Sequence, residues 1–358
     1  MPRTSASMKA VILIGGEGTR LRPLTYEVPK AMVPVLNQPF LEHTLTYLKE
    51  WGVKDIVLAL NYLPGVIQDY FGDGSNLGVR LVCAVEDNPL GTAGAVKNAE
   101  QYLNSTFVVL NGDIFTELDI ADMLAFHRRK GARATIALSW VYDPCAFGVV
   151  ETDSDGRVRR FIEKPGPDQV TSHWINAGIY ILEPEVLEHV PANSHYMFEK
   201  GLFPLLLERD EPVYGYPFSG YWLDMGTLEK YLRLNYDLLL SKARSPLIHG
   251  LSRDGVCCDR DVVIHPSAGI AGPAVIGAKC EINQRVSIKG PVVIGADCRV
   301  GEGASLEGTV VGENVIIGAG ARIQQCIIGS NTRIEENDQV TKHVLTPDNV
   351  REPITVSV

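Results

Sequence analysis

The residues best suited to chemistry form a glycine-rich segment near the start of the chain. Glycines stand at positions 15, 16 and 18, and Arg20 and Lys30 follow them. Glycines this close together let the backbone turn sharply and present N–H groups to a ligand, because no Cβ stands in the way. With the two cations, the segment predicts a cradle for a polyphosphate. A plain turn between two elements is the alternative.

Two familiar phosphate-binding patterns do not fit this segment. A dinucleotide fingerprint needs glycine or alanine where Leu21 stands, and Pro23 follows too closely for the start of a helix. A P-loop needs Gly-Lys-Ser/Thr, which is missing. What remains is the pattern G-G-x-G-T-R-L-x-P-L-T, followed by P-K, and we call residues 15–30 the signature loop.

A carboxylate follows a predicted central strand at 107–110, in the sequence Asn111-Gly112-Asp113. In a doubly wound sheet, ligands bind at the carboxyl ends of the strands. A carboxylate is also the hard oxygen donor that Mg²⁺ prefers. Asp113 is therefore a candidate metal ligand, and an ordinary turn aspartate is the alternative.

A second glycine segment, L-G-T-A-G-A, follows the predicted strand at 81–85 and opens a helix. Gly91 would let a planar base come close to the helix N-terminus, an end that favours anionic ligands. Thr92 is the expected N-cap of this helix. An ordinary capped helix start, with no ligand, is the alternative.

Two further motifs offer groups that suit a phosphorylated sugar. In Glu163-Lys164-Pro165, the glutamate could accept hydrogen bonds from hydroxyls and the lysine could place a point charge near a phosphate. A surface ion pair beside a proline turn is the alternative. Asn176 lies in an apolar strand at 175–180, where a buried amide needs partners that sugar hydroxyls could provide.

Strands and helices alternate in the part of the chain that carries these residues. The continuous apolar run at 10–14 predicts a buried parallel strand, and the spacing of apolar residues at 40–51 predicts a helix. Further strands and helices follow up to the helix near Thr227. This order predicts an α/β, Rossmann-like domain at 8–240 with a mostly parallel sheet and helices on both faces.

The composition changes after residue 262, where apolar residues recur at a step of six that twice slips to five. Such a hexapeptide repeat predicts a parallel β-helix over 262–345, of four to five triangular coils. We expect a linker at 241–261, a tail at 346–358 and a disordered leader at 1–7. His265 is expected on the surface of the β-helix. The repeat positions are 264, 270, 276, 282, 288, 294, 300, 306, 311, 317, 323, 328, 334 and 340.

Composition narrows the class of protein. The 358 residues carry a formal net charge of −10, which argues against binding to nucleic acid or to an anionic membrane surface. No apolar run approaches the length of a membrane span. Seven scattered cysteines without C-x-x-C pairs predict free thiols in a reducing compartment, and hence a cytoplasmic protein.

Together these motifs resemble those of the sugar-1-phosphate nucleotidylyltransferases that carry a left-handed β-helix. The resemblance implies transfer of a nucleotidyl group from a nucleoside triphosphate to a sugar 1-phosphate, with Mg²⁺ on Asp113 and on Asp224 of the W-L-D-M-G-T segment. Capping of the following helix, by Asp224 or by Thr227, is the structural alternative. Arg20, Lys30, Asp113 and Lys164 would be catalytic. Nucleotide contacts are implied for Leu13, Gly15, Gly16, Gly18, Thr19, Gly91 and Asn111, and sugar-phosphate contacts for Gly148, Glu163, Lys164, Asn176 and Gly178.

The motif forms are most similar to those of the mannose-1-phosphate guanylyltransferases, which implies GTP and mannose 1-phosphate as substrates. Ala31 stands where those enzymes often have a second proline. A glucose-1-phosphate thymidylyl- or uridylyltransferase is the alternative within the class. A non-catalytic regulatory paralogue that senses nucleotide-sugar is the alternative outside it, with a bifunctional acyltransferase behind it. We expect a homo-oligomer, with the β-helix as an assembly and regulatory element that could be removed without loss of turnover.

Overall fold

The computed structural model describes residues 8–247, 255–348 and 350–354. The expected leader at 1–7 lies outside these residues. The chain divides into two compact units that do not follow the order of the sequence. One, the sheet unit, joins the residues up to Glu17 with Thr44–Trp222. The other, the β-helix unit, joins Gly18–His43 with the chain from Leu223 onward, so the predicted domain boundaries stay predictions.

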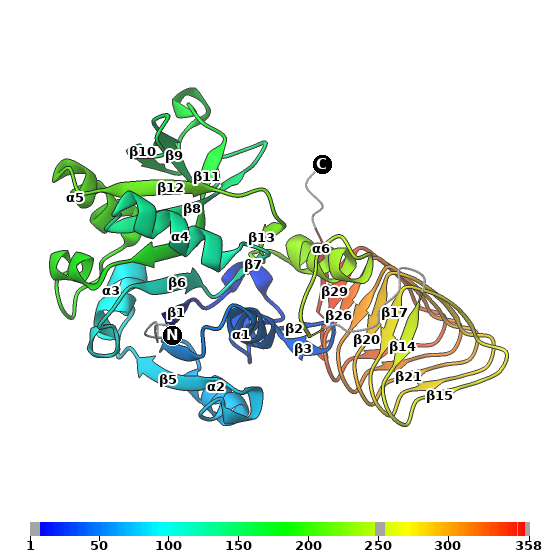
Figure 1. The fold of residues 1–358 in the computed structure, drawn as a ribbon. Coiled ribbons are helices and arrows are strands. Elements are labelled where there is room, and N and C mark those ends of the chain that lie inside the picture. The colour runs from blue at the N-terminus through cyan, green and yellow to red at the C-terminus, as the bar shows by residue number, and fades with distance from the viewer. Residues whose placement is uncertain (1–7, 248–254, 349, 355–358) are drawn as a thin grey trace. The chain divides into compact units, whose positions relative to one another are not determined.

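A mixed sheet forms the centre of the sheet unit (Figure 1), in the order β10-β9-β11-β6-β1-β4-β5, with β8 and β12 joined beside β11. Strands β5, β4, β1 and β6 are parallel, whereas β11 is antiparallel to β6, β8 and β9. The strands are β1 (Lys9–Ile14), β4 (Asp55–Leu60), β5 (Arg80–Val85), β6 (Phe107–Asn111), β8 (Ala134–Trp140), β9 (Gly148–Thr152), β10 (Val158–Glu163), β11 (Trp174–Leu182) and β12 (Val213–Pro217). The short strand β7 (Ile114–Thr116) lies outside this sheet.

The continuous apolar run in β1 is explained by burial on both faces of the sheet. Ala10, Val11 and Ile12 are all fully buried although their side chains alternate between the faces. Val11 belongs to one core cluster with Val96 of α3 and Phe203 of α5. Helices α2 (Pro64–Phe71), α3 (Gly91–Asn98), α4 (Ile120–Lys130) and α5 (Phe203–Glu208) follow their strands, and α1 (Phe40–Glu50) precedes β4.

The β-helix of the second unit is a stack of short parallel strands in three sheets (Figure 1). Ile276 pairs with Ile294 on the next coil, and Ile294 pairs with Val311 on the coil after that. The slip in the repeat therefore shortens a coil by one residue without breaking the inward column of aliphatic side chains. The sheets are β14-β17-β20-β23-β26-β29-β30, β15-β18-β21-β24-β27 and β16-β19-β22-β25-β28.

Strands extend on both sides of the predicted repeat. The first strand, β14 (Val256–Cys258), lies in the segment expected as a linker, and β30 (Arg351–Pro353) pairs antiparallel with β29 in the segment expected as a tail. The strands between them are β15 (Val263–Ile264), β16 (Gly269–Ala271), β17 (Ala274–Ile276), β18 (Glu281–Ile282), β19 (Ser287–Lys289), β20 (Val292–Ile294), β21 (Arg299–Val300), β22 (Ser305–Glu307), β23 (Val310–Val311), β24 (Ile316–Ile317), β25 (Arg322–Gln324), β26 (Ile327–Ile328), β27 (Arg333–Ile334), β28 (Gln339–Thr341) and β29 (His343–Leu345).

From Gly18 onward, the signature loop and the residues after it, up to His43, belong to this same unit. The Asn37 side chain donates a hydrogen bond of 2.8 Å to the carbonyl of Ile294 in the β-helix. Helix α6 (Leu228–Leu239) lies against the coils, where the Tyr236 hydroxyl donates to the carbonyl of Gly308. Asn235 of α6 in turn accepts a 2.9 Å hydrogen bond from the Leu36 backbone N–H. Short strands β2 (Pro34–Val35), β3 (Gln38–Pro39) and β13 (Trp222–Asp224) complete the chain. None of the described helices is long and apolar enough to span a membrane.

Candidate functional site

The signature loop is shaped by Gly18, whose backbone is left-handed with φ +64°. A Cβ at this position would lie 3.1 Å from both the Lys30 and the Thr25 side chains. The buried Thr25 hydroxyl also donates a 2.8 Å hydrogen bond to the Gly18 carbonyl. Glycine is therefore required here by the loop itself, because it lets the two ends of the loop close against each other. The neighbouring Gly16 is different, since nothing lies within 4 Å of its Cβ position.

Three cationic side chains of the β-helix unit surround Asp224. Lys30 Nζ lies 3.9 Å from Asp224 Oδ1, and Lys230 Nζ lies 3.3 Å from Oδ2. A Cβ at Gly226 would lie 2.9 Å from the Asp224 carboxylate and 3.1 Å from the Arg20 guanidinium. The fold thus brings Arg20 and Lys30 close to Asp224, and the cluster carries a net positive charge that suits a polyphosphate.

The helix that follows Asp224 is capped by Thr227 rather than by the aspartate. The Thr227 hydroxyl accepts from the Lys230 backbone N–H at 3.3 Å, which leaves the Asp224 carboxylate available to the cations. The Lys230 side chain reaches Asp224 because this cap starts the first turn of α6 beside it. Of the two structural alternatives, Thr227 as the cap is confirmed.

In the sheet unit, the segment Asn111–Asp113 lies beside the end of β1. Asn111 pairs with Leu13 across the parallel strands, and Gly112 donates a 2.9 Å hydrogen bond to the Leu13 carbonyl. A Cβ at Gly112 would lie 2.6 Å from that carbonyl oxygen, so only glycine fits. Leu13, Asn111 and Asp113 are thereby held at the carboxyl edge of the parallel strands, where the sequence predicted a ligand. A Cβ at Gly15, at this edge, would lie 3.7 Å from the Asn61 side chain.

Asn111 faces the middle of β11, where Gly178 has φ +73°. The Asn111 amide nitrogen would be 2.7 Å from a Cβ at Gly178, and the Asn111 amide oxygen is buried without a hydrogen-bond partner among the described residues. Asn176 accepts from the Gly178 N–H at 2.9 Å and donates to the Tyr180 hydroxyl at 2.8 Å. The buried amide predicted at Asn176 therefore has protein partners, and the unsatisfied oxygen belongs to Asn111.

The Glu163 carboxylate lies against Gly148 at the edge of the β9–β10 hairpin. A Cβ at Gly148 would be 2.7 Å from the Phe161 ring and 2.9 Å from Glu163 Oε2, and the two contacts together favour glycine. Burial, together with the nearby Glu199 carboxylate, raises the pKa of Glu163, while Lys164 and Lys200 oppose the rise. Burial and the Glu199 charge likewise raise the pKa of Tyr180. Lys164 itself is exposed, with φ +50°.

The expected N-cap of α3 is wrong. The cap position is Leu90, and the Thr92 hydroxyl instead donates to Glu199 Oε2 at 3.0 Å and accepts from the Phe198 N–H at 2.9 Å. The close approach at Gly91 is made by protein, because a Cβ there would lie 2.8 Å from the Tyr196 carbonyl oxygen. A long-range contact with the segment around Tyr196 therefore explains the glycine without a ligand.

Two parts of the chain match known protein families. Residues 9–241 match the nucleotidyl transferase family, and residues 270–357 match the GMPPB C-terminal domain. The chain belongs to the nucleotidyl transferase family.

Relatives of this nucleotidyltransferase with a curated name include enzymes for different sugars. It is 41% identical to the mannose-1-phosphate guanylyltransferase of Mycobacterium tuberculosis, over 76% of each chain. It is 39% identical to a probable mannose-1-phosphate guanylyltransferase of Oryza sativa, over 75% of each chain. It is also 35% identical to a UTP–glucose-1-phosphate uridylyltransferase of Synechocystis, over 78% of this chain and 76% of that one.

Solved structures match about two thirds of the nucleotidyltransferase. HddC from Yersinia pseudotuberculosis is 31% identical with a TM-score of 0.56, over 64% of this chain and 98% of that one. A putative glucose-1-phosphate thymidylyltransferase from Bacillus anthracis is 27% identical with a TM-score of 0.58, over 64% and 94% of the two chains. The Yersinia protein has also been solved in complex with GMP-PN.

Asp224 is one of the two predicted metal ligands, and its carboxylate has donor capacity left for a cation. Asp224 Oδ1 is buried and accepts no hydrogen bond from the described residues, as expected of a carboxylate oxygen with room for a cation. No group of three or more His, Cys, Asp or Glu side chains in the described part of the chain could by itself enclose a metal ion. Mg²⁺ keeps waters and substrate oxygens among its ligands, so one or two carboxylates are sufficient. The residues present fit Mg²⁺ held together with a substrate.

Sequence reasoning missed two residues of the site. Lys230 lies six positions after Asp224, beyond the helix cap. The spacing of the motif alone does not predict that the two side chains form a contact. Glu199 lies in a π-helical turn, Phe198–Leu202, and such turns are frequent at functional sites. Neither lies within the motifs used above. No sequence motif marks Glu199. Only the structure shows that its carboxylate is close enough to Glu163 to raise the pKa of that residue.

Proposed function

We propose that this nucleotidyltransferase transfers a guanylyl group from GTP to mannose 1-phosphate and releases pyrophosphate. The observation that carries the reaction class is the cluster of Arg20, Lys30 and Lys230 around Asp224. The choice of substrates is supported by the relatives named mannose-1-phosphate guanylyltransferase, at 41% and 39% identity over three quarters of the chain.

The cationic side chains act in the proposed reaction by position and charge. A phosphate oxygen of the sugar 1-phosphate attacks the α-phosphorus in line, and pyrophosphate leaves. We assign Arg20 to the charge of the leaving pyrophosphate, Lys30 to the α-phosphate, and Lys164 to the orientation of the attacking phosphate. No general base is needed, because the attacking phosphate is already ionised. Asp113 and Asp224 would hold Mg²⁺, which supplies charge neutralisation to a polyphosphate.

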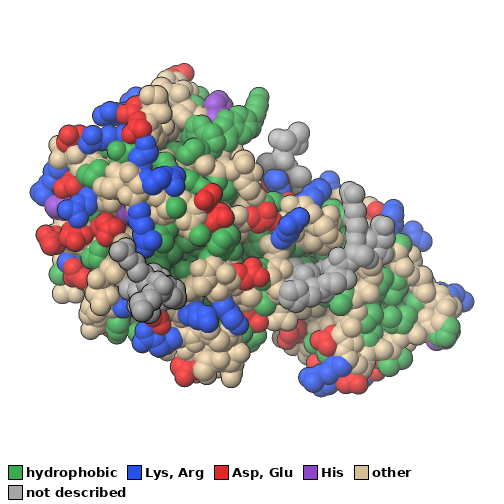
Figure 2. All heavy atoms as spheres, viewed as in Figure 1, with side chains coloured by type: hydrophobic (Ala, Val, Ile, Leu, Met, Phe, Trp, Pro, Cys, Tyr) green, Lys and Arg blue, Asp and Glu red, His purple; other side chains and the backbone are tan. Residues whose placement is uncertain are grey.

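The remaining predicted residues would bind the two substrates. Backbone N–H groups of the signature loop would cradle the phosphates, and Glu163 would accept hydrogen bonds from sugar hydroxyls. Lysine and arginine side chains are interspersed with acidic ones over the visible face of the sheet unit (Figure 2), so we infer that phosphate binding relies on local groups rather than a broad basic surface. The nucleotide contacts proposed are Leu13, Gly15, Gly16, Gly18, Thr19, Gly91 and Asn111, and the sugar-phosphate contacts are Gly148, Glu163, Lys164, Asn176 and Gly178.

The proposal is tested by measuring the release of pyrophosphate in the presence of Mg²⁺, for each nucleoside triphosphate with each of several sugar 1-phosphates. The expected result is one dominant combination, GTP with mannose 1-phosphate. A maximum at UTP or dTTP with glucose 1-phosphate would keep the reaction and overturn the substrates. Silence in every combination, with nucleotide-sugar still bound, would instead identify a regulatory paralogue.

We further propose that the protein acts in the cytoplasm as a homo-oligomer assembled through its β-helix. All seven cysteines are free thiols, which suits a reducing compartment. Light scattering of the full chain checks the oligomer, and fractionation of cells that express it checks the compartment. A monomer, or a secreted protein, would contradict the respective part.

A further inference from the structure

A cavity of about 470 Å³ lies within the β-helix unit, lined on one side by Pro23 of the signature loop and by Met32, just after it. Its other walls are Tyr231 of α6 and the turns of the β-helix from Val293 to Val350. This volume is in the range of small-molecule sites. None of the residues to which we assigned the proposed reaction lines the cavity.

The β-helix side of the cavity is a wall of glycines from successive coils, at positions 295, 312 and 329. A Cβ at Gly295 would lie 2.5 Å from the backbone of Gly312, and one at Gly312 would lie 2.6 Å from Ser330. The stacking of coils therefore already requires the first two of these glycines, and no ligand is needed to explain them. Their effect is a bare backbone surface, without side chains to fill the space.

The charges of the cavity decide what it can bind. Glu27, Glu313 and Asp348 line it, and none of its described lining residues is lysine or arginine. Two tyrosines, Tyr26 and Tyr231, add aromatic surface. The Arg22 guanidinium already lies over the Tyr26 ring, 5.4 Å from its centroid, which is the geometry of a cation–π contact. Nucleotides and sugar phosphates are anions, so the carboxylates disfavour them.

We propose that this cavity is a binding site for a small organic cation with an apolar body. The carboxylates supply the countercharge, and Leu24, Val28 and Met32 supply the apolar contact. A cation held between carboxylates and apolar side chains, and partly removed from water, gains more from such contacts than one on the open surface.

A ligand bound in the cavity would also affect the position of the proposed catalytic cluster. Met32 ends the short turn Lys30–Met32, and Pro23 and Leu24 follow the turn Thr19–Leu21 that carries Arg20. Tyr231, which also lines the cavity, donates a 2.7 Å hydrogen bond to the carbonyl of Pro34, two residues after Met32. A ligand in the cavity would therefore contact Met32 of one turn and the residues Pro23 and Leu24 that follow the other. This coupling, unlike the site itself, rests on the proposed function.

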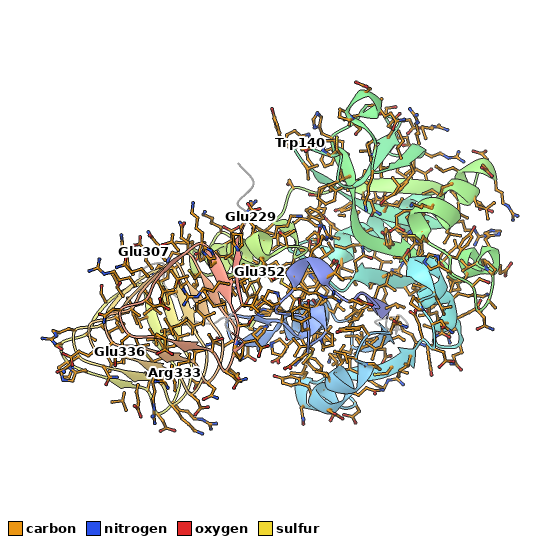
Figure 3. All side chains as sticks on the ribbon, turned by 180° about the vertical axis from the view of Figure 1, so that it is seen from behind. Trp140, Glu229, Glu307, Arg333, Glu336 and Glu352 are labelled. Atoms are coloured by element: carbon orange, nitrogen blue, oxygen red, sulfur yellow. The ribbon has the colours of Figure 1, made fainter. Side chains whose placement is uncertain are left out.

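Three probes that share one indole body test the charge rule on the full chain: tryptamine as cation, tryptophol as neutral analogue and indole-3-acetate as anion. Isothermal titration should show affinity falling in that order. Glu313→Gln should weaken tryptamine about two- to fivefold, the range expected for a partly exposed charge pair. Glu336→Gln is the matched control, because Glu336 lies on the outside of the coils (Figure 3) and does not line the cavity.

A second variant fills the space. Pro347 lines the cavity and is exposed, so Pro347→Trp should block tryptamine while leaving the unfolding temperature close to that of the parent. Equal affinity for tryptamine and indole-3-acetate would overturn the site. Tryptamine binding that survives both Pro347→Trp and Glu313→Gln would also overturn it. A third refuting result is that tryptamine, agmatine and spermidine all fail to bind. If tryptamine binds as expected but no substrate combination releases pyrophosphate, the site stands and the proposed function fails.

Discussion

Replacement of Gly18 by alanine tests whether the signature loop depends on the left-handed backbone conformation of this residue. The residue has φ +64°, a conformation that costs an L-residue about 1–2 kcal/mol. The new Cβ would also stand 3.1 Å from the Lys30 and Thr25 side chains. At this distance the neighbours must move by a few tenths of an ångström, and Lys30 is the side chain that faces Asp224.

The expected loss has two parts that different assays report. At about 2–4 °C for each kcal/mol in a unit of this size, the strain lowers the unfolding temperature by about 2–8 °C. Displacement of Lys30 removes at most one charge-assisted contact, about 1.5–3 kcal/mol, which corresponds to a roughly ten- to hundredfold lower rate of pyrophosphate release. Gly18→Asn should recover part of the unfolding temperature, because asparagine tolerates the left-handed region, but not the rate.

Gly16→Ala is the matched control. Nothing lies within 4 Å of its Cβ position, and its φ is not in the left-handed region. Its unfolding temperature should therefore equal that of the parent, and any fall in rate would report close approach of a substrate to the loop. Scanning calorimetry and a coupled pyrophosphate assay give the two quantities. Unchanged temperature and rate in Gly18→Ala would refute the assignment of this glycine to the closure of the loop.

Three further changes follow from the same geometry. Gly226→Ala should leave the fold intact but push the Asp224 carboxylate aside, lowering the pyrophosphate rate by at least about tenfold; an unchanged rate would contradict its place in the site. Since burial raises the pKa of Glu163, its ionisation destabilises the fold. The parent should lose stability as pH rises from about 4.3 through the raised value, and Glu163→Gln should flatten that fall in thermal scans; parallel curves would refute it. A chain cut after Ser245 should lose activity, because Asn37 loses its β-helix partner, and full turnover would refute this.

The β-helix shows how far a repeat alone can predict a structure. The step of six places one aliphatic side chain inward on each face, and burial in the described coils follows that step from Ile276 to Val340. The prediction succeeds because each coil contacts only its neighbours, so local periodicity contains the long-range contacts. His265 is exposed, as expected for a residue outside the inward positions.

The misassigned Thr92 shows what local reasoning cannot reach. A threonine at a helix start is a good N-cap by propensity, yet its hydroxyl is taken by Glu199 and the Phe198 backbone, more than a hundred residues away in the chain. The same long-range segment explains Gly91 through the Tyr196 carbonyl. These contacts depend on tertiary packing, which overrides propensity and leaves no periodic trace in the sequence.

The most consequential difference concerns the signature loop and the β-helix. Their distance in sequence suggests a catalytic domain with a detachable assembly module, as the sequence analysis expected. The contacts argue for the opposite, because Gly18–His43 forms one compact unit with the chain from Leu223 onward. His43 hydrogen-bonds Ser245 at 2.6 Å, and burial lowers its pKa to about 4, so this link stays neutral at ordinary pH. Lys30, and the turn that holds it, are thus supported by the β-helix unit, which makes that unit part of the machinery proposed to bind polyphosphate.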